Sequence, residues 1–373
     1  MSGRDLHREA FDESTLVKLD LYRRYIRAWL PVFLNCKSFS VDRIQIFDFF
    51  SGPGRDLNGV SGSPMIAVEE ITAALAKGHI NNPAIHLYLN EYKKEKFTDL
   101  KSTFDQISMP KLVKVHFLNE DFPVAFAKWK EIHDLEDSRK IKSADLLFLD
   151  QNGTKQITQD VFSRIVNTDR TDFLFFISSS FINRFKSQGQ NRKGTPIEVS
   201  DLTNMTTKTA HRILCNAYKR WLPEDQEYYL APFSIEKDHG SNVYGLIFGS
   251  RHPAGIDKFL SICWKEDKLR GEANFDIDGE HIVPNQMTFW EEIKIPNKIQ
   301  VFEKHLRELV LAKKLTSNVE VYKYALNEAC RGSHAKEVLE KMVEEKLLPK
   351  QRFTISYESC GLKGSVPKPI LFS

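Results

Sequence analysis

The stretch Ile44–Gly54 (IQIFDFFSGPG) constrains the fold of this chain more than any other. Its first half is apolar and favours a strand, and its second half is a Gly-Pro-Gly turn. Buried parallel strands have this composition when they stop at a tight turn whose backbone a ligand can approach. Asp48 stands near the carboxyl end of the predicted strand, where open α/β sheets bind their ligands. Alone, so short a glycine pattern favours an ordinary strand and turn, so its meaning depends on the strands and loops farther along the chain.

Apolar strands and helices alternate along the first half of the chain. An amphipathic helix is predicted from Ser14 to Phe33, with Asp12, Ser14 or Thr15 as its cap. We expect its cations to form a solvated face; they are Lys18, Arg23, Arg24 and Arg27. Strands are predicted at 44–50, 84–90, 113–118, 144–150 and 171–177, with a helix in each interval. Such alternation predicts a parallel sheet wound with right-handed crossovers.

A β-hairpin, Glu227–Ile235 and Asn242–Gly249, comes next and closes the sheet. Pro232 argues against a central place for its strand, or marks a bulge. The chain is therefore predicted to form an α/β sheet of seven strands with one antiparallel member. This differs from the all-parallel nucleotide-binding fold.

Acidic residues follow the strands at one edge of the predicted sheet. Glu91 ends the second strand, Glu120 and Asp121 follow the third, and Asp150 ends the fourth. One acid in a loop is usually only solvated, but here the same kind of group recurs at successive strand ends. A carboxylate at the position of Glu91 suits a ribose, because it can accept hydrogen bonds from both hydroxyls.

Two segments near this edge are irregular. Residues 55–64 separate the Gly-Pro-Gly turn from its helix, which is predicted to begin near Met65. This spacing differs from the compact G-x-G-x-x-G fingerprint and counts against a plain NAD site. Residues 181–225 form an insertion, in which the polar loop Ser187–Gly194 is either a lid over the strand ends or a disordered excursion.

Length favours two domains, since the chain has 373 residues. We predict a first domain over 1–265, a linker over 266–297 and a second domain over 298–373. Three helices and a strand at Gln351–Tyr357 suggest that the second domain is a small winged-helix-like α+β module. Residues 298–373 hold 14 Lys and Arg against 9 Asp and Glu. This surplus leaves both nucleic-acid contact and protein docking open.

Composition narrows the compartment and the cofactor chemistry. The five cysteines are dispersed and include no Cys-x-x-Cys pair, so we expect neither a metal site nor a disulfide framework. The amino terminus lacks the apolar core of a signal peptide, and no apolar run is long enough to span a bilayer. The sequence predicts a soluble cytoplasmic protein with no membrane partner.

Several motifs together resemble one protein family. They are Asp48–Gly54, Gly62-Ser63-Pro64, the strand end at Glu91, and Tyr244–Pro253 (YGLIFGSRHP). These residues are similar to those of the bacterial three-Cys-motif partner proteins, which have a class I methyltransferase-like, Rossmann-like fold. The resemblance covers most of the chain and extends to the opening helix and the winged-helix-like end.

The resemblance implies S-adenosylmethionine (SAM) as the cofactor. It places the turn formed by Asp48, Ser51, Gly52, Pro53 and Gly54 at the methionine end, Glu91 at the ribose, and Asp121 or Glu120 near the adenine. It also implies a partner protein with a three-cysteine motif of the radical-SAM kind. The dispersed cysteines of this chain could not hold such a cluster themselves.

The fourth strand end departs from the family pattern. The family usually has Asp-Pro-aromatic-Gly there, whereas this chain has Asp150-Gln151-Asn152-Gly153. Asp150 is the one catalytic candidate, as an orienter or base for the acceptor, and the aromatic platform for an amine is missing. The sequence thus leaves two functions open. One is a SAM-dependent methyltransferase of unknown acceptor, and the other is a non-catalytic nucleotide- or SAM-binding adaptor that recruits a protein or DNA through its carboxyl-terminal domain.

Overall fold

The fold is known from a computed structural model. It describes residues 10–37, 40–151, 156–178, 196–203, 205–206, 209–237, 242–275, 297–361 and 365–372. The predicted loop Ser187–Gly194 lies outside these residues, as do Asn152 and Gly153.

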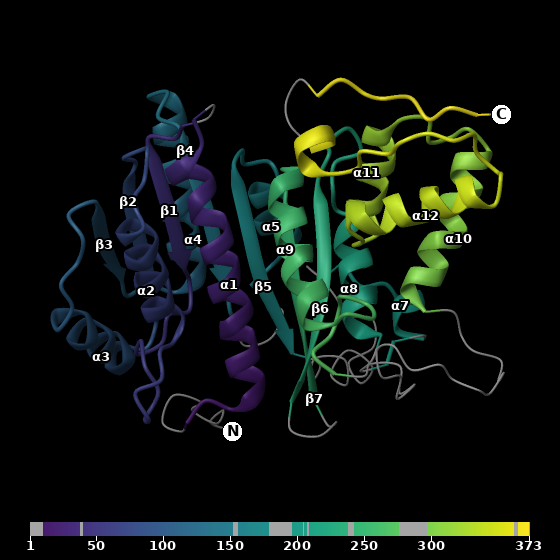
Figure 1. The fold of residues 1–373 in the computed structure, drawn as a ribbon. Coiled ribbons are helices and arrows are strands. Elements are labelled where there is room, and N and C mark those ends of the chain that lie inside the picture. Colours follow the sequence, from purple (N-terminus) through teal and green to yellow (C-terminus); the bar gives the residue numbers. More distant parts are fainter. Residues whose placement is uncertain are drawn as a thin grey trace.

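A seven-stranded sheet forms the centre of the molecule (Figure 1). Its strands, in chain order, are β1 (Arg43–Asp48), β2 (Ala84–Asn90), β3 (Val113–Leu118), β4 (Ser143–Leu149), β5 (Thr171–Ser178), β6 (Tyr229–Lys237) and β7 (Asn242–Ser250). In space they follow the order β3-β2-β1-β4-β5-β7-β6. The first five strands pair in parallel, and β7 runs antiparallel to both β5 and β6. The predicted α/β sheet with one antiparallel member is therefore confirmed.

The strand order explains two features of the sequence. Crossovers on either side of β1 place β2 and β4 beside it, so the chain reverses direction across the sheet at the β1–β4 boundary. Ligands bind at the carboxyl ends of strands at such a boundary. Strand β6 lies at the end of the sheet, which accommodates Pro232 because an edge strand can dispense with one backbone donor.

Helices cover both faces of the sheet. Their bounds are α1 (Glu13–Asn35), α2 (Ser63–Ala76), α3 (Lys94–Asp105), α4 (Phe122–Ser138), α5 (Gln159–Val166), α7 (Val199–Thr203), α8 (Ala210–Lys219) and α9 (Pro253–Glu266). Helices α1, α2, α3 and α9 share one hydrophobic core with one face of the sheet. Helices α4, α5 and α8 share a second core with the other face (Figure 1). The chain thus has three layers, as the alternation of strands and helices predicts.

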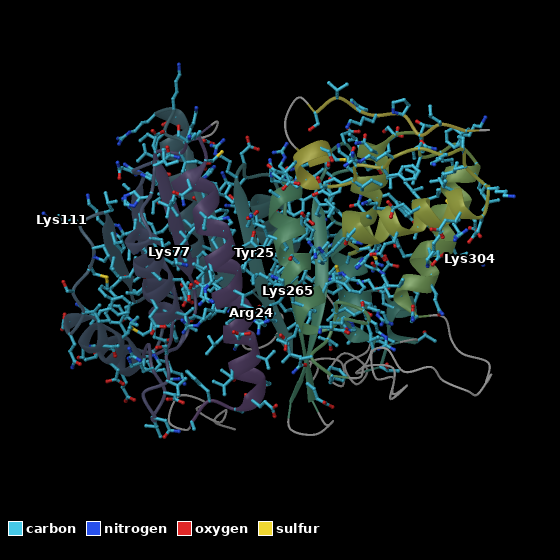
Figure 2. All side chains as sticks on the ribbon, viewed as in Figure 1. Arg24, Tyr25, Lys77, Lys111, Lys265 and Lys304 are labelled. Atoms are coloured by element: carbon cyan, nitrogen blue, oxygen red, sulfur yellow. The ribbon has the colours of Figure 1, made fainter. Side chains whose placement is uncertain are left out.

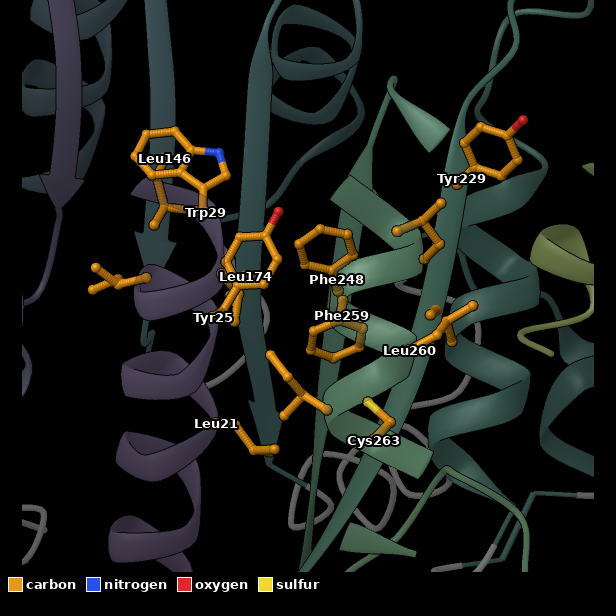
Figure 3. Close-up of a cluster of buried hydrophobic side chains, with 14 of the residues drawn as sticks. Leu21, Tyr25, Trp29, Leu146, Leu174, Tyr229, Phe248, Phe259, Leu260 and Cys263 are labelled. Carbon is orange, nitrogen blue, oxygen red and sulfur yellow. The ribbon is translucent and has the colours of Figure 1, made fainter. Parts of the chain in front are cut away.

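Helix α1 forms the centre of the first core. Asp12 caps its amino end by accepting a hydrogen bond from the backbone N–H of Thr15 at 2.8 Å. Its buried side chains, including Tyr25 and Trp29, lie against β4 and β5 and face residues of α9 such as Phe259 (Figure 3). An aromatic side chain buried in this way contributes about 2–3 kcal/mol through the hydrophobic effect.

The cations of α1 form a solvated face only in part: the side chains of Arg24 and Arg27 are 37% and 58% exposed, whereas Lys18 is 15% exposed. They pair with acids on other elements: Lys18 with Asp150, Arg23 with Glu69 and Glu70, Arg24 with Glu266, and Arg27 with Glu70. Burial acts to raise the pKa of Glu70, but hydrogen bonds from Arg27 and Arg23 hold it below its usual range. The helix is therefore fixed to its neighbours by charge as well as by its apolar stripe.

Close packing between β5 and β7 leaves no room for a side chain at Gly249. A Cβ atom there would lie 2.2 Å from the ring of Phe173, the residue directly opposite on β5. That ring is buried and stacks on Phe175, so it has little room to move. We expect Gly249→Ala to lower the free energy of unfolding in urea by about 2–3 kcal/mol.

Gly245, on the same strand and face, is the matched control. A Cβ atom at Gly245 would make only ordinary contacts, with the Cβ and Cα of His211 at 3.6 and 3.7 Å and the carbonyl oxygen of Ile177 at 3.8 Å. Gly245→Ala should change the free energy of unfolding by less than about 1 kcal/mol. Equal effects of the two substitutions would show that strand propensity, and not the Phe173 contact, sets the cost.

The carboxyl-terminal region packs directly against the sheet layer. Its helices are α10 (Lys298–Leu311), α11 (Asn318–Asn327) and α12 (Gly332–Glu344), as the sequence predicts. The indole N–H of Trp264 on α9 donates to the backbone carbonyl of Ala329 at 3.1 Å. The side chains of α10–α12 belong to the same core cluster as those of α1 and α9. The division at 265 and 297 stays a prediction.

One expectation for this region is wrong. Residues 351–356 form no strand, and a π-helical turn, Tyr357–Gly361, comes after them. The start of the predicted linker pairs with the edge strand. The backbone N–H of Ser234 on β6 donates to the carbonyl of Glu272 at 2.7 Å, and the carbonyl of Ser234 accepts from the backbone N–H of Asn274 at 3.2 Å. These bonds satisfy outer backbone groups of the edge strand β6, which would otherwise be open to pairing with another chain.

Candidate functional site

The carboxyl ends of β1, β2, β3 and β4 bring the predicted site residues together. Asp48 is the last residue of β1 and pairs in register with Leu89 and Phe148 on the neighbouring strands. Glu91 and Asp150 each lie two residues beyond those partners, and the charges of both raise the pKa of Asp48. Three of the predicted acids therefore share one edge of the sheet.

Glu91 fixes the conformation of the glycine turn. One carboxylate oxygen accepts from the backbone N–H of Gly52 at 3.0 Å, and the other accepts from that of Lys93 at 2.8 Å. Gly52 and Gly54 have φ angles of 62° and 90°, which glycine adopts without strain. Glu91 is buried, with 8% of its surface exposed. Each of its oxygens has a second lone pair, so the carboxylate can still accept hydrogen bonds from a ligand.

The rest of the turn is held by the strand end and by helix α3. The hydroxyl of Ser51 donates to the carbonyl of Asp48 at 3.1 Å. The carbonyl of Pro53 accepts from the hydroxyl of Thr103 at 3.1 Å, and that of Gly54 accepts from the backbone N–H of Gly62 at 2.8 Å. The turn predicted from the sequence is thus a rigid element between β1, α2 and α3.

Asn90 connects three strand ends, and the sequence pattern does not identify it as a site residue. Its side-chain amide donates to the carbonyls of Phe49 and Glu120, both at 3.1 Å. Its side-chain oxygen accepts from the backbone N–H of Glu120 at 3.1 Å. The sequence feature that could identify Asn90 is a polar residue at the end of an otherwise apolar strand.

Asp48 is a buried carboxylate with a strongly altered acidity. Burial raises the pKa of Asp48 to about 7, although hydrogen bonds from the Ser63 hydroxyl, at 2.6 Å, and the Phe50 backbone N–H partly oppose the rise. The hydroxyl of Tyr22 has no hydrogen-bond partner among the described residues. Burial raises the pKa of Tyr22 well above its usual range, and the charge of Asp48 raises it further. Perturbed acids of this kind concentrate at functional sites.

Asp150 pairs with a cation that the sequence pattern places in solvent. Lys18 on α1 donates to the Asp150 carboxylate, and its ammonium lies 5.3 Å from the centre of the Phe176 ring. The side chains of Lys18 and Asp150 are 15% and 30% exposed. The sequence feature that could indicate this pairing is the position of Lys18, one helical turn before Tyr22 and on the side of α1 that faces the sheet. Gln151, the next residue, is buried, and its side-chain oxygen accepts from the backbone N–H of Gln156 at 3.1 Å.

The acids after β3 lie farther from this centre. Glu120 is half-buried and forms an ion pair with Lys128 at 2.6 Å. Asp121 is exposed and stands at the first position before α4, where its side chain makes no capping bond. Both remain predictions for the adenine end of a cofactor.

Two further observations concern the described residues as a whole. No group of three or more His, Cys, Asp or Glu side chains within them has a geometry that could hold a metal ion. Among the same residues, no helix is both long and apolar enough to cross a bilayer.

Comparison with known proteins identifies only distant likenesses. No family model matches the chain, and no curated protein matches its sequence. Solved structures with a similar fold include protein LPL1258 from Legionella pneumophila, which is 11% identical with a TM-score of 0.36 over 64% of this chain and 85% of that one. The protein yhhF from Escherichia coli, described as a candidate methyltransferase, is 11% identical with a TM-score of 0.29 over 66% and 87%.

The cyclopropane synthase MmaA2 from Mycobacterium tuberculosis is 8% identical, with a TM-score of 0.29 over 68% of this chain and 70% of that one. Likenesses this distant concern the fold alone.

Proposed function

We propose that the protein binds SAM at the carboxyl ends of β1 to β4 and acts as a methyltransferase-like protein. The single observation that carries the proposal is the contact between Glu91 and Gly52, which joins the turn after β1 to the acid after β2. A cofactor with an amino-acid end and a ribose needs both elements at a fixed separation. Here one carboxylate sets that separation.

The charge of this edge favours a cationic ligand. Five predicted site residues are acids, and the cations paired with them are Lys18 and Lys128. SAM carries a sulfonium and an ammonium group against one carboxylate, so it brings a net positive charge. An acidic edge whose central carboxylates, Asp48 and Glu91, are buried attracts such a ligand and disfavours a triphosphate.

Asp150 is the proposed catalytic residue. Methyl transfer from a sulfonium needs little acid–base chemistry, because alignment of the acceptor with the methyl group does most of the work. Lys18 holds Asp150 by an ion pair beside the strand end. In this arrangement the carboxylate orients an acceptor group. It can accept the proton of that group once the ion pair with Lys18 has separated.

We also propose a partner protein carrying a three-cysteine motif, on the resemblance of Asp48–Gly54 and Tyr244–Pro253 to the partner family. Co-expression and co-purification of such a protein with this chain tests the pairing. The second candidate function is a non-catalytic adaptor that binds SAM or a nucleotide, and the altered turn after Asp150 favours it.

Calorimetric titration of the whole protein separates these functions. We expect saturable heat with SAM at one molecule per chain and none with ATP, which shares the adenosine but carries negative charge. Heat with ATP alone would favour the nucleotide-binding adaptor. Absence of binding heat with SAM would refute both the proposed methyltransferase activity and the proposed cofactor.

A further inference from the structure

The carboxyl-terminal region has an uneven distribution of charge. Three stretches, 309–319, 346–357 and 365–372, contain no acidic residue at all. They contain six cations, all exposed: Lys313, Lys314, Lys346, Lys350, Arg352 and Lys368. None of these six forms an ion pair among the described residues, whereas Arg307, Lys336 and Lys341 in the same region do.

Hydrogen bonds join the three stretches into one surface. The backbone N–H of Asn318 donates to the carbonyl of Lys368 at 3.0 Å, and that of Ile370 donates to the carbonyl of Thr316 at 2.7 Å. The side chain of Gln351 bonds both the N–H and the carbonyl of Leu371, each at 2.9 Å.

Further contacts hold the same surface from within. The amide of Asn318 donates to the carbonyl of Thr354 at 2.9 Å. Beneath the surface lie the buried side chains of Leu348, Phe353, Ile355 and Ile370. The six cations are therefore carried by a fixed frame. We refer to these six residues as the basic surface.

The six cations are exposed and form no ion pair among the described residues, so they can contact an outside anion, whereas the carboxylate of Glu320 at the edge of the frame is engaged by Thr316 and Ser317. A partner with regularly spaced negative charges releases counterions when it binds. We propose that the basic surface binds the phosphate backbone of nucleic acid. This inference is independent of the SAM site, since none of its residues lies on the β1–β4 edge.

The neighbouring helix α12 indicates how such binding works. Its exposed face carries both signs: Lys336 pairs with Glu340 at 3.5 Å, and Lys341 with Glu303 at 3.1 Å. Glu337 and Glu344 add further negative charge to that face. A helix that reads bases in a groove needs cations and neutral donors, so α12 is unsuited to base reading. The basic surface then contacts phosphates only, and binding is independent of sequence.

An anionic membrane is the alternative partner for such a surface. Membrane-surface binding relies on a helix that buries one continuous apolar face. Here the exposed apolar side chains, Leu311, Leu347, Val366 and Leu371, occupy separate segments, and α10 and α12 bury their apolar stripes in the core. Nucleic acid is therefore favoured.

Fluorescence anisotropy with a labelled 20-base-pair duplex tests the proposal on the full chain. Six cations limit the slope of log K against log salt to about −5, and we expect a slope of about −3 to −5. Affinity should fall about 60- to 1,000-fold between 50 and 200 mM KCl, as this slope requires. A duplex of scrambled sequence and equal base composition should bind within about twofold.

Matched variants locate the contact. The triple variant Lys350→Gln, Arg352→Gln, Lys368→Gln should reduce the slope by about 2–3 and the affinity at 50 mM KCl by at least about 30-fold. The control Lys77→Gln, Lys111→Gln, Lys265→Gln removes the same charge from exposed positions elsewhere (Figure 2) and should bind as the wild type does. Circular dichroism melting of both variants verifies that they fold.

Two results overturn the proposal: no duplex binding at 50 mM KCl, and equal losses of affinity in the two triple variants. If the protein binds no duplex but sediments with phosphatidylserine vesicles, the basic surface belongs to a membrane instead. None of them bears on the SAM titration, so the two proposals fail separately.

Discussion

Replacing Glu91 with alanine is expected to weaken SAM binding at least about 100-fold and to lower the free energy of unfolding by about 2–3 kcal/mol. The stability loss arises because the N–H groups of Gly52 and Lys93 lose their acceptor, and an unpaired buried donor costs about 1–3 kcal/mol. The affinity loss arises because two ribose hydroxyls each lose a bond to a charged acceptor of about 1.5 kcal/mol. Calorimetric titration and urea unfolding measure the two effects.

Two control variants distinguish the loss of ribose hydrogen bonds from the loss of support for the glycine turn. Glu91→Gln keeps the shape and one acceptor oxygen, and should lose about tenfold in affinity. Asp134→Ala removes an exposed acid paired with Lys130 on α4, and should cost less than about 0.5 kcal/mol of stability with SAM affinity unchanged. If folded Glu91→Ala binds SAM as the wild type does, Glu91 holds the turn but no ribose.

Asp48→Asn is expected to remove a large pH dependence of stability. In the wild type, burial raises the pKa of Asp48 to about 7. The folded protein therefore keeps a proton that the unfolded chain releases above about pH 4. The resulting stabilisation is complete below about pH 4 and is lost as the pH rises through 7, a difference of about 4 kcal/mol. Urea unfolding between pH 4 and 8.5 should show this fall in the wild type and a flatter profile in Asp48→Asn.

The same residue should couple SAM binding to protons. A cationic ligand beside Asp48 favours the carboxylate, so binding below pH 7 releases a proton. SAM affinity should rise from pH 6 to pH 8 in the wild type, by up to about tenfold per pH unit below the pKa, and stay level in Asp48→Asn.

Asp172→Asn is the matched control for both pH effects. Burial raises the pKa of Asp172 to about 6, and the carboxylate accepts from Tyr25 at 2.7 Å near the amino end of β5. Its substitution should remove the part of the pH dependence of stability that is centred near pH 6. The pH dependence of SAM affinity should stay as in the wild type. A change of that dependence in Asp172→Asn would place its origin outside the β1–β4 edge.

The fold can be predicted largely from local patterns. Each strand of the sheet is a short apolar run bounded by turn residues, and the hairpin with Pro232 indicates both the edge strand and the antiparallel member. The acids at the strand ends are identified in the same way, because parallel strands bring their carboxyl ends to one edge.

The contacts that depend on tertiary structure cannot be predicted in this way. Helical periodicity does not show which strand a side chain will meet, so it places Lys18 in solvent, whereas Lys18 meets Asp150, 132 residues away. Residues 351–356 favour a strand by composition, but a strand needs a partner. In the structure Gln351 and Thr354 bond instead to Leu371 and Asn318.

Helix α1 has a consequence for the order of folding. It is the first element of the sheet domain to leave the ribosome, yet its partners are made much later: Asp150, Asp172 and Glu266 come after Lys18, Tyr25 and Arg24 by 132, 147 and 242 residues. Contacts of such long range form slowly, because the intervening loop must close first. The nascent chain thus carries an amphipathic helix, and the part of its apolar side that packs against α9 stays uncovered until α9 is released. We therefore expect apolar surface to be exposed during synthesis, when a chain in this state is prone to aggregate.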